Sequence, residues 1–337
     1  MSELEQKGKS PEAASTEAPA SETKSPRKNS PDVMATPPTT VLPEIDPILP
    51  PEHWATLDNG NSDDDSALGD SYSDSTASIT SSILNYRTLY GRTFHSDIGN
   101  AQYCVDTICS PWFSMESCFW LLSRILRDFA DKFPNCEVIG TDISPIQSTW
   151  VPPNLKFEIE DCTQAWTFPP NSFDFIHIRY LVGSIPDWTA FFKEAYSALE
   201  PGGYLESYET SARLYSDDDT IPPTSAMAQW TPLFIDGGRK IGRSFDVVET
   251  NTQNTAMKEA GFVDIQEKWI KKEIGTVAGW AVESDMEGFV MFVSSVQGWT
   301  KEEVQVYAAH LRRELRSKKQ HVWYWQKIVW GRKPEAS

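Results

Sequence analysis

Three short apolar segments, each followed by polar residues, constrain what this chain can fold into. They lie within residues 136–209 and cover residues 137–140, 155–159 and 173–178. Their lengths, their β-branched and aromatic side chains and the loops between them predict β-strands. An amphipathic segment follows at residues 188–199, between a capping residue, Asp187, and a stop at Pro201, so we expect a helix there. Strands that alternate with a helix are typical of a parallel α/β sheet.

The C-terminal half continues this pattern. Further strands are predicted at residues 204–208 and 262–270. Thr300 and Glu303 have the spacing of a capping box at the start of another helix. Residues 321–333 alternate in polarity and are rich in aromatic side chains, so we expect a last strand there. It would pair antiparallel with residues 262–270 and close the sheet edge.

The first 82 residues have a composition that does not support a folded core. They are rich in Ser, Pro, Thr and charged side chains, and their apolar residues follow no period. Such a segment cannot bury enough apolar surface to offset the entropy lost on ordering. We therefore expect a disordered, acidic N-terminal tail over residues 1–82 and one α/β domain over residues 83–334.

Charge and cysteine content limit the partners that we expect. The formal net charge of −18 argues against a nucleic-acid-binding surface, which needs clustered Lys and Arg. Cys104, Cys109 and Cys118 lie close together, but no His accompanies them at a zinc-like spacing, so we expect no metal site. The sequence has neither the apolar core of a signal peptide nor an uninterrupted membrane span. The expected location is intracellular, in the nucleus or the cytoplasm.

Two acidic residues at strand ends are the first candidates for a binding site. Asp142 ends the strand at 137–140, where a carboxylate can accept hydrogen bonds from both hydroxyls of a ribose. A carboxylate that only caps the next turn is an equally good interpretation of Asp142 from its position. Asp161 ends the next strand and could accept from an adenine amino group, while the backbone N–H of Cys162 donates to the ring. Together, the two positions favour a nucleoside.

The third strand ends in Arg179 and Tyr180, which should border the same crevice. His177 lies two residues deeper, where a histidine is more often a satisfied core residue than a base. The residues therefore indicate a ligand site, but they do not identify a catalytic group.

Several long motifs in order carry a resemblance to a known family. They include EVIGTDISPIQ, WVPPNLKFEIEDC, FDFIHIRYLVGSI and DWTAFFKEAYSALEPGGYLE. Together with matches upstream to YGRTFH and downstream to GRKP, the chain resembles the fungal LaeA-like S-adenosylmethionine-dependent methyltransferases. The resemblance covers most of the chain after the tail.

The resemblance implies a class I methyltransferase fold, a Rossmann-like α/β sheet of mostly parallel strands with a terminal antiparallel strand. It also implies S-adenosylmethionine as the cofactor. An acidic residue at Asp142, next to Ile143, would hold the ribose, and Asp161 with Cys162 would face the adenine. Arg179 and Tyr180 would border the methionine part and the methyl acceptor.

One departure from the family concerns residues 96–133. Family members have a strand and a glycine-rich turn before the helix that ends in a phrase like DFADKFP. Here no glycine lies between Asn100 and Gly140, so no residue without a Cβ is present for close approach to the methionine carboxylate. The strand that this segment replaces is the central one, between the strands that end at Asp142 and Ile178. We expect the central first strand to be absent or replaced, so that the two halves of the sheet pair directly, recruit another segment or leave open edges.

Three functions are compatible with these features. The first is a methyltransferase of fungal secondary metabolism, biosynthetic or regulatory, that acts on a small molecule or on a protein in a regulatory complex. The second is a catalytically impaired regulator or scaffold with the same fold. A nicotinamide-dependent dehydrogenase ranks last, because it would explain Asp142 but not Asp161 or the long motif matches.

Overall fold

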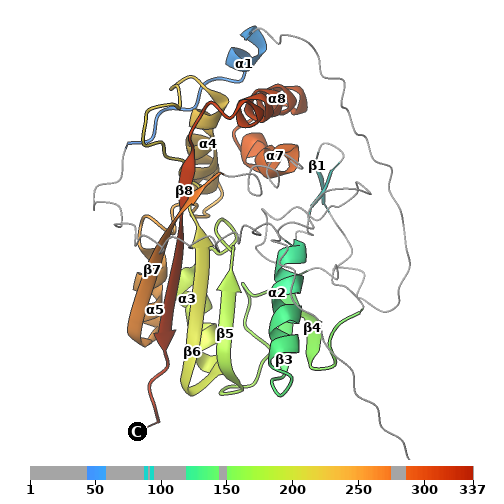
Figure 1. Cartoon of the computed structure of the whole chain (residues 1–337), viewed down its shortest axis with the longest axis vertical. Helices are drawn as coiled ribbons and strands as arrows, with labels where there is room; N and C mark the ends of the chain where they lie inside the picture. The colour runs from blue at the N-terminus through green and yellow to red at the C-terminus, as the bar shows by residue number, and fades with distance from the viewer. Residues whose placement is uncertain are drawn as a thin grey trace, which may run out of the picture. The chain divides into compact units, whose positions relative to one another are not determined.

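The computed structural model describes residues 44–57, 87–89, 92–94, 119–143, 150–274 and 286–336. Within these residues the strands form a small parallel sheet, a four-stranded mixed sheet and a hairpin, with helices packed around them (Figure 1). The hairpin consists of β1 (Arg87–Leu89) and β2 (Arg92–Phe94). It lies in the segment where the sequence predicts order to begin.

The small sheet contains two of the predicted strands, β3 (Val138–Asp142) and β4 (Leu155–Ile159), which pair in parallel. Helix α2 (Phe119–Lys132) packs against them through Leu126 and the fully buried Ala130. The apolar side chains at the end of this helix are only partly buried, because Phe129 and Phe133 are 39% and 41% exposed. Their rings lie 4.7 Å apart, against each other rather than in a core.

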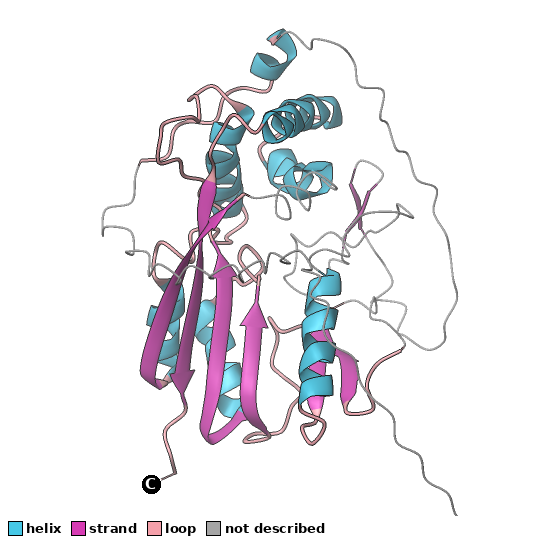
Figure 2. Cartoon of the chain, in the orientation of Figure 1, coloured by secondary structure: helices cyan, strands magenta, loops and turns pink. Residues whose placement is uncertain are grey.

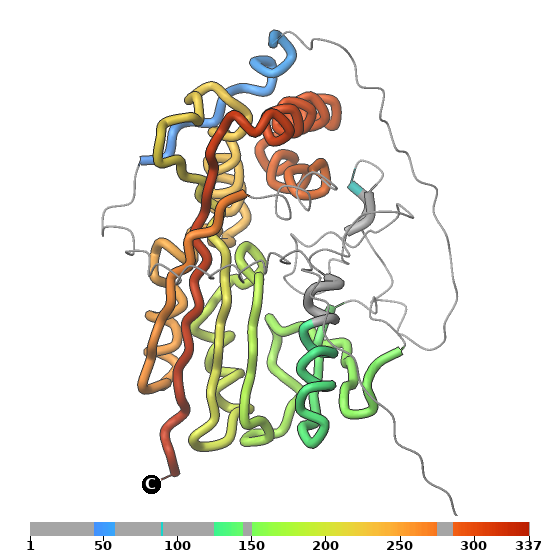
Figure 3. The backbone as a smooth tube through the Cα atoms, in the orientation of Figure 1, coloured from blue at the N-terminus to red at the C-terminus, as the bar shows by residue number. Residues whose placement is uncertain are grey.

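The four-stranded sheet has the order β5–β6–β8–β7. Its strands are β5 (Phe173–Arg179), β6 (Leu199–Thr210), β7 (Val263–Glu273) and β8 (Trp323–Arg332). β5 and β6 are parallel, and β8 is antiparallel to both of its neighbours. The C-terminal strand therefore lies between β6 and β7, and β7 forms the edge (Figure 3). The predicted antiparallel pair is confirmed.

The two sheets share no ladder in the described part of the chain. Their strand order is the one obtained when a strand between β3 and β5 is left out of a single sheet. The structure thus agrees with the expected class, a mostly parallel α/β sheet with a C-terminal antiparallel strand. The prediction that residues 96–133 replace the central first strand falls mostly on residues outside those that the structure describes.

Two helices cover one face of the larger sheet, α3 (Trp188–Ala198) and α5 (Thr252–Ala260) (Figure 2). The core between them contains the fully buried side chains of Phe192, Leu205 and Met257. α3 begins as predicted, because the Asp187 carboxylate accepts a hydrogen bond from the Ala190 N–H at 2.9 Å. The apolar face of α3 is therefore what fixes the position of β5 and of the loop after it.

A second core joins four helices, α1 (Glu52–Thr56), α4 (Ala226–Lys240), α7 (Met286–Val296) and α8 (Lys301–Ser317). Trp54 of α1 is fully buried and packs 5.2 Å from the ring of Tyr307. The prediction of a disordered tail up to residue 82 is therefore wrong for residues 44–57. The reason is that Trp54 gains its burial from α8, a helix far away in the sequence. Residues 1–43 and 58–82 lie outside the described residues.

The capping box of α8 is formed as expected. The Thr300 side chain accepts from the Glu303 N–H at 3.3 Å, and the Glu303 carboxylate accepts from the Thr300 N–H at 2.7 Å. We expect Thr300→Ala to lower the free energy of unfolding by about 1 kcal/mol. Urea denaturation measures this loss, and Thr300→Ser should retain most of the stability. Equal losses in both variants would show that the hydroxyl does not act as the cap.

No helix among the described residues is long and apolar enough to cross a membrane.

Candidate functional site

The first two candidate residues meet at one edge of the small sheet. Asp142 is the last residue of β3 and pairs with Ile159 at the end of β4. The Glu160 N–H donates to the Asp142 carbonyl at 2.9 Å, and Asp161 follows directly. Because parallel strands end on the same side, Asp142, Ile143 and Asp161 lie at a common carboxyl edge, which is where open α/β sheets bind ligands.

Asp161 has one carboxylate oxygen in use and one without a partner. Its Oδ1 accepts from the N–H of Thr163 at 3.0 Å and from the Thr163 hydroxyl at 2.7 Å, which fixes the turn after β4. Its Oδ2 is buried and has no hydrogen-bond partner among the described residues. A buried acceptor without a donor is costly. Asp161 is therefore prepared to accept a hydrogen bond from a ligand.

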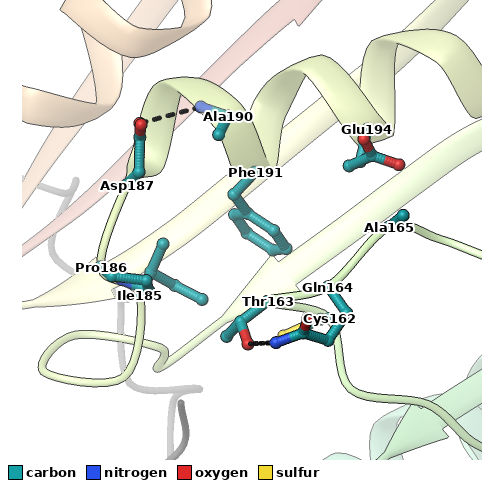
Figure 4. Close-up of a pocket in the computed structure, with 10 residues that line it drawn as sticks. All are labelled: Cys162, Thr163, Gln164, Ala165, Ile185, Pro186, Asp187, Ala190, Phe191 and Glu194. Atoms are coloured by element: carbon teal, nitrogen blue, oxygen red, sulfur yellow. Dashed lines mark hydrogen bonds between the residues drawn. The ribbon is translucent and has the colours of Figure 1, made fainter. Parts of the chain in front are cut away.

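A pocket of about 250 Å³ lies beside this turn. One wall is formed by Cys162 to Ala165 and the other by Ile185 to Asp187 and the first turns of α3 (Figure 4). The Phe191 ring faces the turn from α3, and Glu194 ties the two walls together by accepting from the Trp166 N–H at 3.0 Å. The pocket thus has the apolar ring of Phe191 on one side and the polar side chains of Thr163 and Gln164 on the other, a lining that suits a planar heterocycle.

Arg179 ends β5 in a clamp of tyrosines. Its guanidinium carbon lies 4.5 Å from the ring centre of Tyr180 and 4.6 Å from that of Tyr208, the residue opposite it on β6. Its Nη2 donates to the Tyr180 hydroxyl at 2.9 Å. Gln326 of β8 completes the group, because it donates to the Tyr180 hydroxyl at 3.0 Å and accepts from the Tyr208 hydroxyl at 2.5 Å.

The chain turns sharply directly after Arg179. Tyr180 has a φ of 55°, in the left-handed region that a bulky residue rarely adopts. Such backbone strain persists only where the surroundings enforce it, and it is concentrated at functional sites. Here the enforcing groups are the Tyr180 N–H, which donates to the Tyr208 carbonyl at 3.0 Å, and a buried carboxylate, Glu209.

Glu209 holds the loop that follows β5. Its two oxygens accept from the N–H groups of Leu181 at 3.1 Å and Val182 at 2.9 Å. Burial raises the pKa of Glu209 to about 8, against these two hydrogen bonds and the nearby Arg179, which lower it. Burial likewise raises the pKa of the Tyr208 phenol to about 12. Sequence reasoning did not identify Glu209 as part of the site.

His177 is only partly satisfied. Its Nδ1 is 2.9 Å from Glu206 Oε1 on the neighbouring strand, but its Nε2 is buried without a hydrogen-bond partner among the described residues. His177 lies on the same face of β5 as Arg179, two residues further from the carboxyl edge. We assign no catalytic role to it.

The site residues thus fall into two groups. Asp142, Asp161 and Cys162 belong to the β3–β4 edge and its pocket, and Arg179 and Tyr180 belong to the β5 end. No ladder among the described residues joins the two groups, because β3 and β5 are in different sheets.

Comparison with known proteins shows what this chain is similar to. A family model described as a methyltransferase domain matches residues 121–267. The methyltransferase pytC of Aspergillus terreus is 34% identical over 210 residues, which are 58% of this chain and 64% of pytC. The secondary metabolism regulator LAE1 of Cochliobolus heterostrophus is 30% identical over 224 residues, which are 62% of this chain and 72% of LAE1. The chain therefore covers slightly less than two thirds of pytC and more than two thirds of LAE1.

Among solved structures, the chain is similar to phosphoethanolamine N-methyltransferase 2 of Haemonchus contortus, which was solved in complex with S-adenosyl-L-methionine. The sequence identity is 16% and the TM-score is 0.36, over 62% of this chain and 46% of that one.

Proposed function

The chain belongs to the LaeA-like family of fungal S-adenosylmethionine-dependent methyltransferases, and on this premise we propose that it transfers a methyl group from S-adenosylmethionine to an acceptor of secondary metabolism. The acceptor is a small molecule or a protein of a regulatory complex, since the relatives include both a methyltransferase and a regulator. We place this activity in the nucleus or the cytoplasm.

The observation that carries the proposal is the unpartnered carboxylate oxygen of Asp161 beside the pocket. In this assignment Asp161 accepts from the exocyclic amino group of adenine, Phe191 and Cys162 border the ring, and Asp142 with Ile143 holds the ribose. The residues present therefore fit the adenosine part of the cofactor. The glycine-rich turn that would approach the methionine part is not in the sequence from residue 101 to residue 139.

When bound, S-adenosylmethionine would supply a methyl group activated by its bond to a sulfonium sulfur, for in-line attack by the acceptor with S-adenosylhomocysteine as the leaving group. Such a displacement depends mainly on alignment of the two reactants. The protein's contribution is then to bind, orient and exclude water, without a dedicated base.

Binding of S-adenosylhomocysteine to the full chain tests the adenosine assignment. We expect Asp161→Asn to weaken binding about tenfold, because it keeps the oxygen that accepts from Thr163 but replaces the free acceptor with a donor. Asp142→Ala should cost a similar factor by removing the acceptor for the ribose. Isothermal titration calorimetry measures both.

Asp236→Asn is a suitable control, because Asp236 lies on α4 and pairs with Arg239 on the surface. Its affinity should equal that of the unmodified protein. Unchanged affinity in both Asp142→Ala and Asp161→Asn would overturn the assignment of these carboxylates.

The split sheet favours one further candidate, a regulator or scaffold that keeps the family surface without methyl transfer. The observation in its favour is that no ladder joins β3 and β5 among the described residues, together with the missing glycine-rich turn in the sequence. Absence of any binding of S-adenosylhomocysteine by the folded, unmodified protein would select this candidate.

A further inference from the structure

The guanidinium of Arg179 is positioned but not neutralised. None of its nitrogens lies within 4.0 Å of a carboxylate among the described residues, and its Nε is buried without a hydrogen-bond acceptor there. An arginine that only supported the fold would have its donors satisfied and its charge paired. The contacts that Arg179 does make are with the faces of two tyrosine rings, which restrict its rotamer and leave the charge in place.

The nearest buried acid does not cancel this charge. Both oxygens of Glu209 accept from backbone N–H groups of the loop after β5, and burial favours its neutral form near pH 7. The carboxylate is thus used for holding the loop. Arg179 keeps a net positive charge at the end of the strand.

A second donor is directed by the same cluster. The Tyr180 hydroxyl accepts two hydrogen bonds, from Arg179 and from Gln326. The Tyr208 hydroxyl is a further hydrogen-bond neighbour of this phenol, so Tyr180 is held on three sides. Arg179 thus offers a cationic donor with a neutral phenol beside it, an arrangement that suits a carboxylate.

The place of this cluster in the fold points to the ligand. Among the described residues β5 is the end strand of the four-stranded sheet, and Arg179 is its last residue. In the family the turn after the central strand approaches the methionine carboxylate, and this chain has no glycine for such a turn. The end of β5 is the next position along the carboxyl edge.

We propose that Arg179 and the Tyr180 hydroxyl form a carboxylate-binding subsite at the end of β5, which takes the α-carboxylate of the methyl donor or a carboxylate of the acceptor. This rests on the proposed function for the identity of the donor. Gln326 and Tyr208 are positioning residues of the subsite, because they hold the Tyr180 hydroxyl and the guanidinium. The tight turn at Tyr180 serves to place the phenol against Arg179.

Two ligands that differ only in the α-carboxylate test whether the methyl donor supplies the carboxylate that the subsite binds. Titration of the full chain with S-adenosylmethionine and with decarboxylated S-adenosylmethionine should give an affinity ratio of about tenfold or more in favour of the carboxylate, if the donor supplies it. In Arg179→Gln this ratio should fall to near one, because only the ligand with the carboxylate loses affinity. Tyr180→Phe should reduce the ratio in part.

A parallel titration with 4-hydroxybenzoate and 4-hydroxybenzamide, at saturating S-adenosylhomocysteine, tests the acceptor as the source. If the acceptor supplies the carboxylate, Arg179→Gln removes the preference for the benzoate and leaves the preference among the adenosyl ligands unchanged. Arg239→Gln, which removes an exposed guanidinium of α4, is the matched control and should change neither ratio. Circular dichroism and thermal melting check that each variant folds.

The subsite is overturned if folded Arg179→Gln retains both ratios of the unmodified protein, or if the unmodified protein shows no preference for a carboxylate in either pair. A different result, equal and measurable binding of both adenosyl ligands, would overturn the subsite for the donor and leave the proposed cofactor intact. No binding of either adenosyl ligand would contradict the proposed function, and titration of the benzoate pair in the absence of S-adenosylhomocysteine would then decide the subsite by itself.

Discussion

Replacing Gly183 with alanine is expected to lower the free energy of unfolding by about 3 kcal/mol. Gly183 has a φ of 78°, so any side chain there is strained. In addition, a Cβ would lie 2.2 Å from Cζ of Phe245, a buried ring of the helical core. The backbone has little freedom to move away, because the Gly183 N–H donates to the Ser244 carbonyl at 3.1 Å. Urea denaturation monitored by tryptophan fluorescence measures the loss.

Gly242 provides a matched control for the strain alone. Its φ is 68°, close to that of Gly183, but a Cβ there would have no heavy atom within 4 Å. Gly242→Ala should therefore cost only about 1 kcal/mol, the difference between glycine and alanine in the left-handed region. Equal losses at the two positions would contradict the steric argument at Phe245.

The Gly183 variant also tests how the site is built. The loop from Tyr180 to Ser184 is fixed at one end by the Glu209 carboxylate and at the other by the contact of Gly183 with Phe245. A displaced Phe245 would shift the loop and loosen the turn at Tyr180. The carboxylate preference proposed for Arg179 should then weaken in Gly183→Ala but not in Gly242→Ala.

The strands were predictable where a local pattern decided them. β3, β4 and β5 were placed to within two residues because each is a short apolar run between turns. β6 begins earlier than expected, at Leu199, because Gly202 and Gly203 pair with Lys333 from the end of the chain. The Gly202 N–H donates to the Lys333 carbonyl at 3.0 Å, and the Lys333 N–H donates to the Gly203 carbonyl at 2.8 Å. A partner so distant in sequence leaves no local signal.

Trp54 shows the same limit for the tail. Few apolar residues surround it and they follow no period, and the prediction that residues 1–82 are disordered followed from this composition. Its stabilisation comes from Tyr307 and from His310, whose Nε2 lies 3.1 Å from the Trp54 carbonyl oxygen. Composition averages over a segment and misses one large side chain whose partners come from the other end of the chain.

In the site, the strand-end rule placed the acidic residues but not the group that holds the loop. Asp142 and Asp161 could be found because a carboxylate after a parallel strand faces the ligand edge. Glu209 follows Leu205 and Ser207 with a period of two, and all three are fully buried. The alternation of β6 therefore contained the signal that a carboxylate faces the core, and such a residue must bind donors from elsewhere in the chain.

That buried carboxylate should make the stability of the protein depend on pH. The pKa of Glu209 is raised by burial to about 8 in the folded protein, from an ordinary value of 4.5. Between these values the folded protein keeps a proton that the unfolded chain releases. The stabilisation is complete below about pH 4.5 and is lost as the pH rises towards 8, by at most about 1.4 kcal/mol per pH unit.

Glu209→Gln should remove this dependence, because an amide does not titrate. We expect the variant to have a lower free energy of unfolding than the unmodified protein at pH 5. Between pH 5 and pH 8.5 the unmodified protein should lose about 2–3 kcal/mol more than the variant, so that the difference shrinks or reverses. Urea denaturation at several pH values gives the two curves, and their difference cancels the other titrating groups. Glu249→Gln is the comparison. Burial also raises the pKa of Glu249, but this carboxylate binds Tyr215 and holds no part of the loop after Tyr180. Parallel curves for Glu209→Gln and the unmodified protein would show that Glu209 is ionised throughout, and its charge would then compensate Arg179.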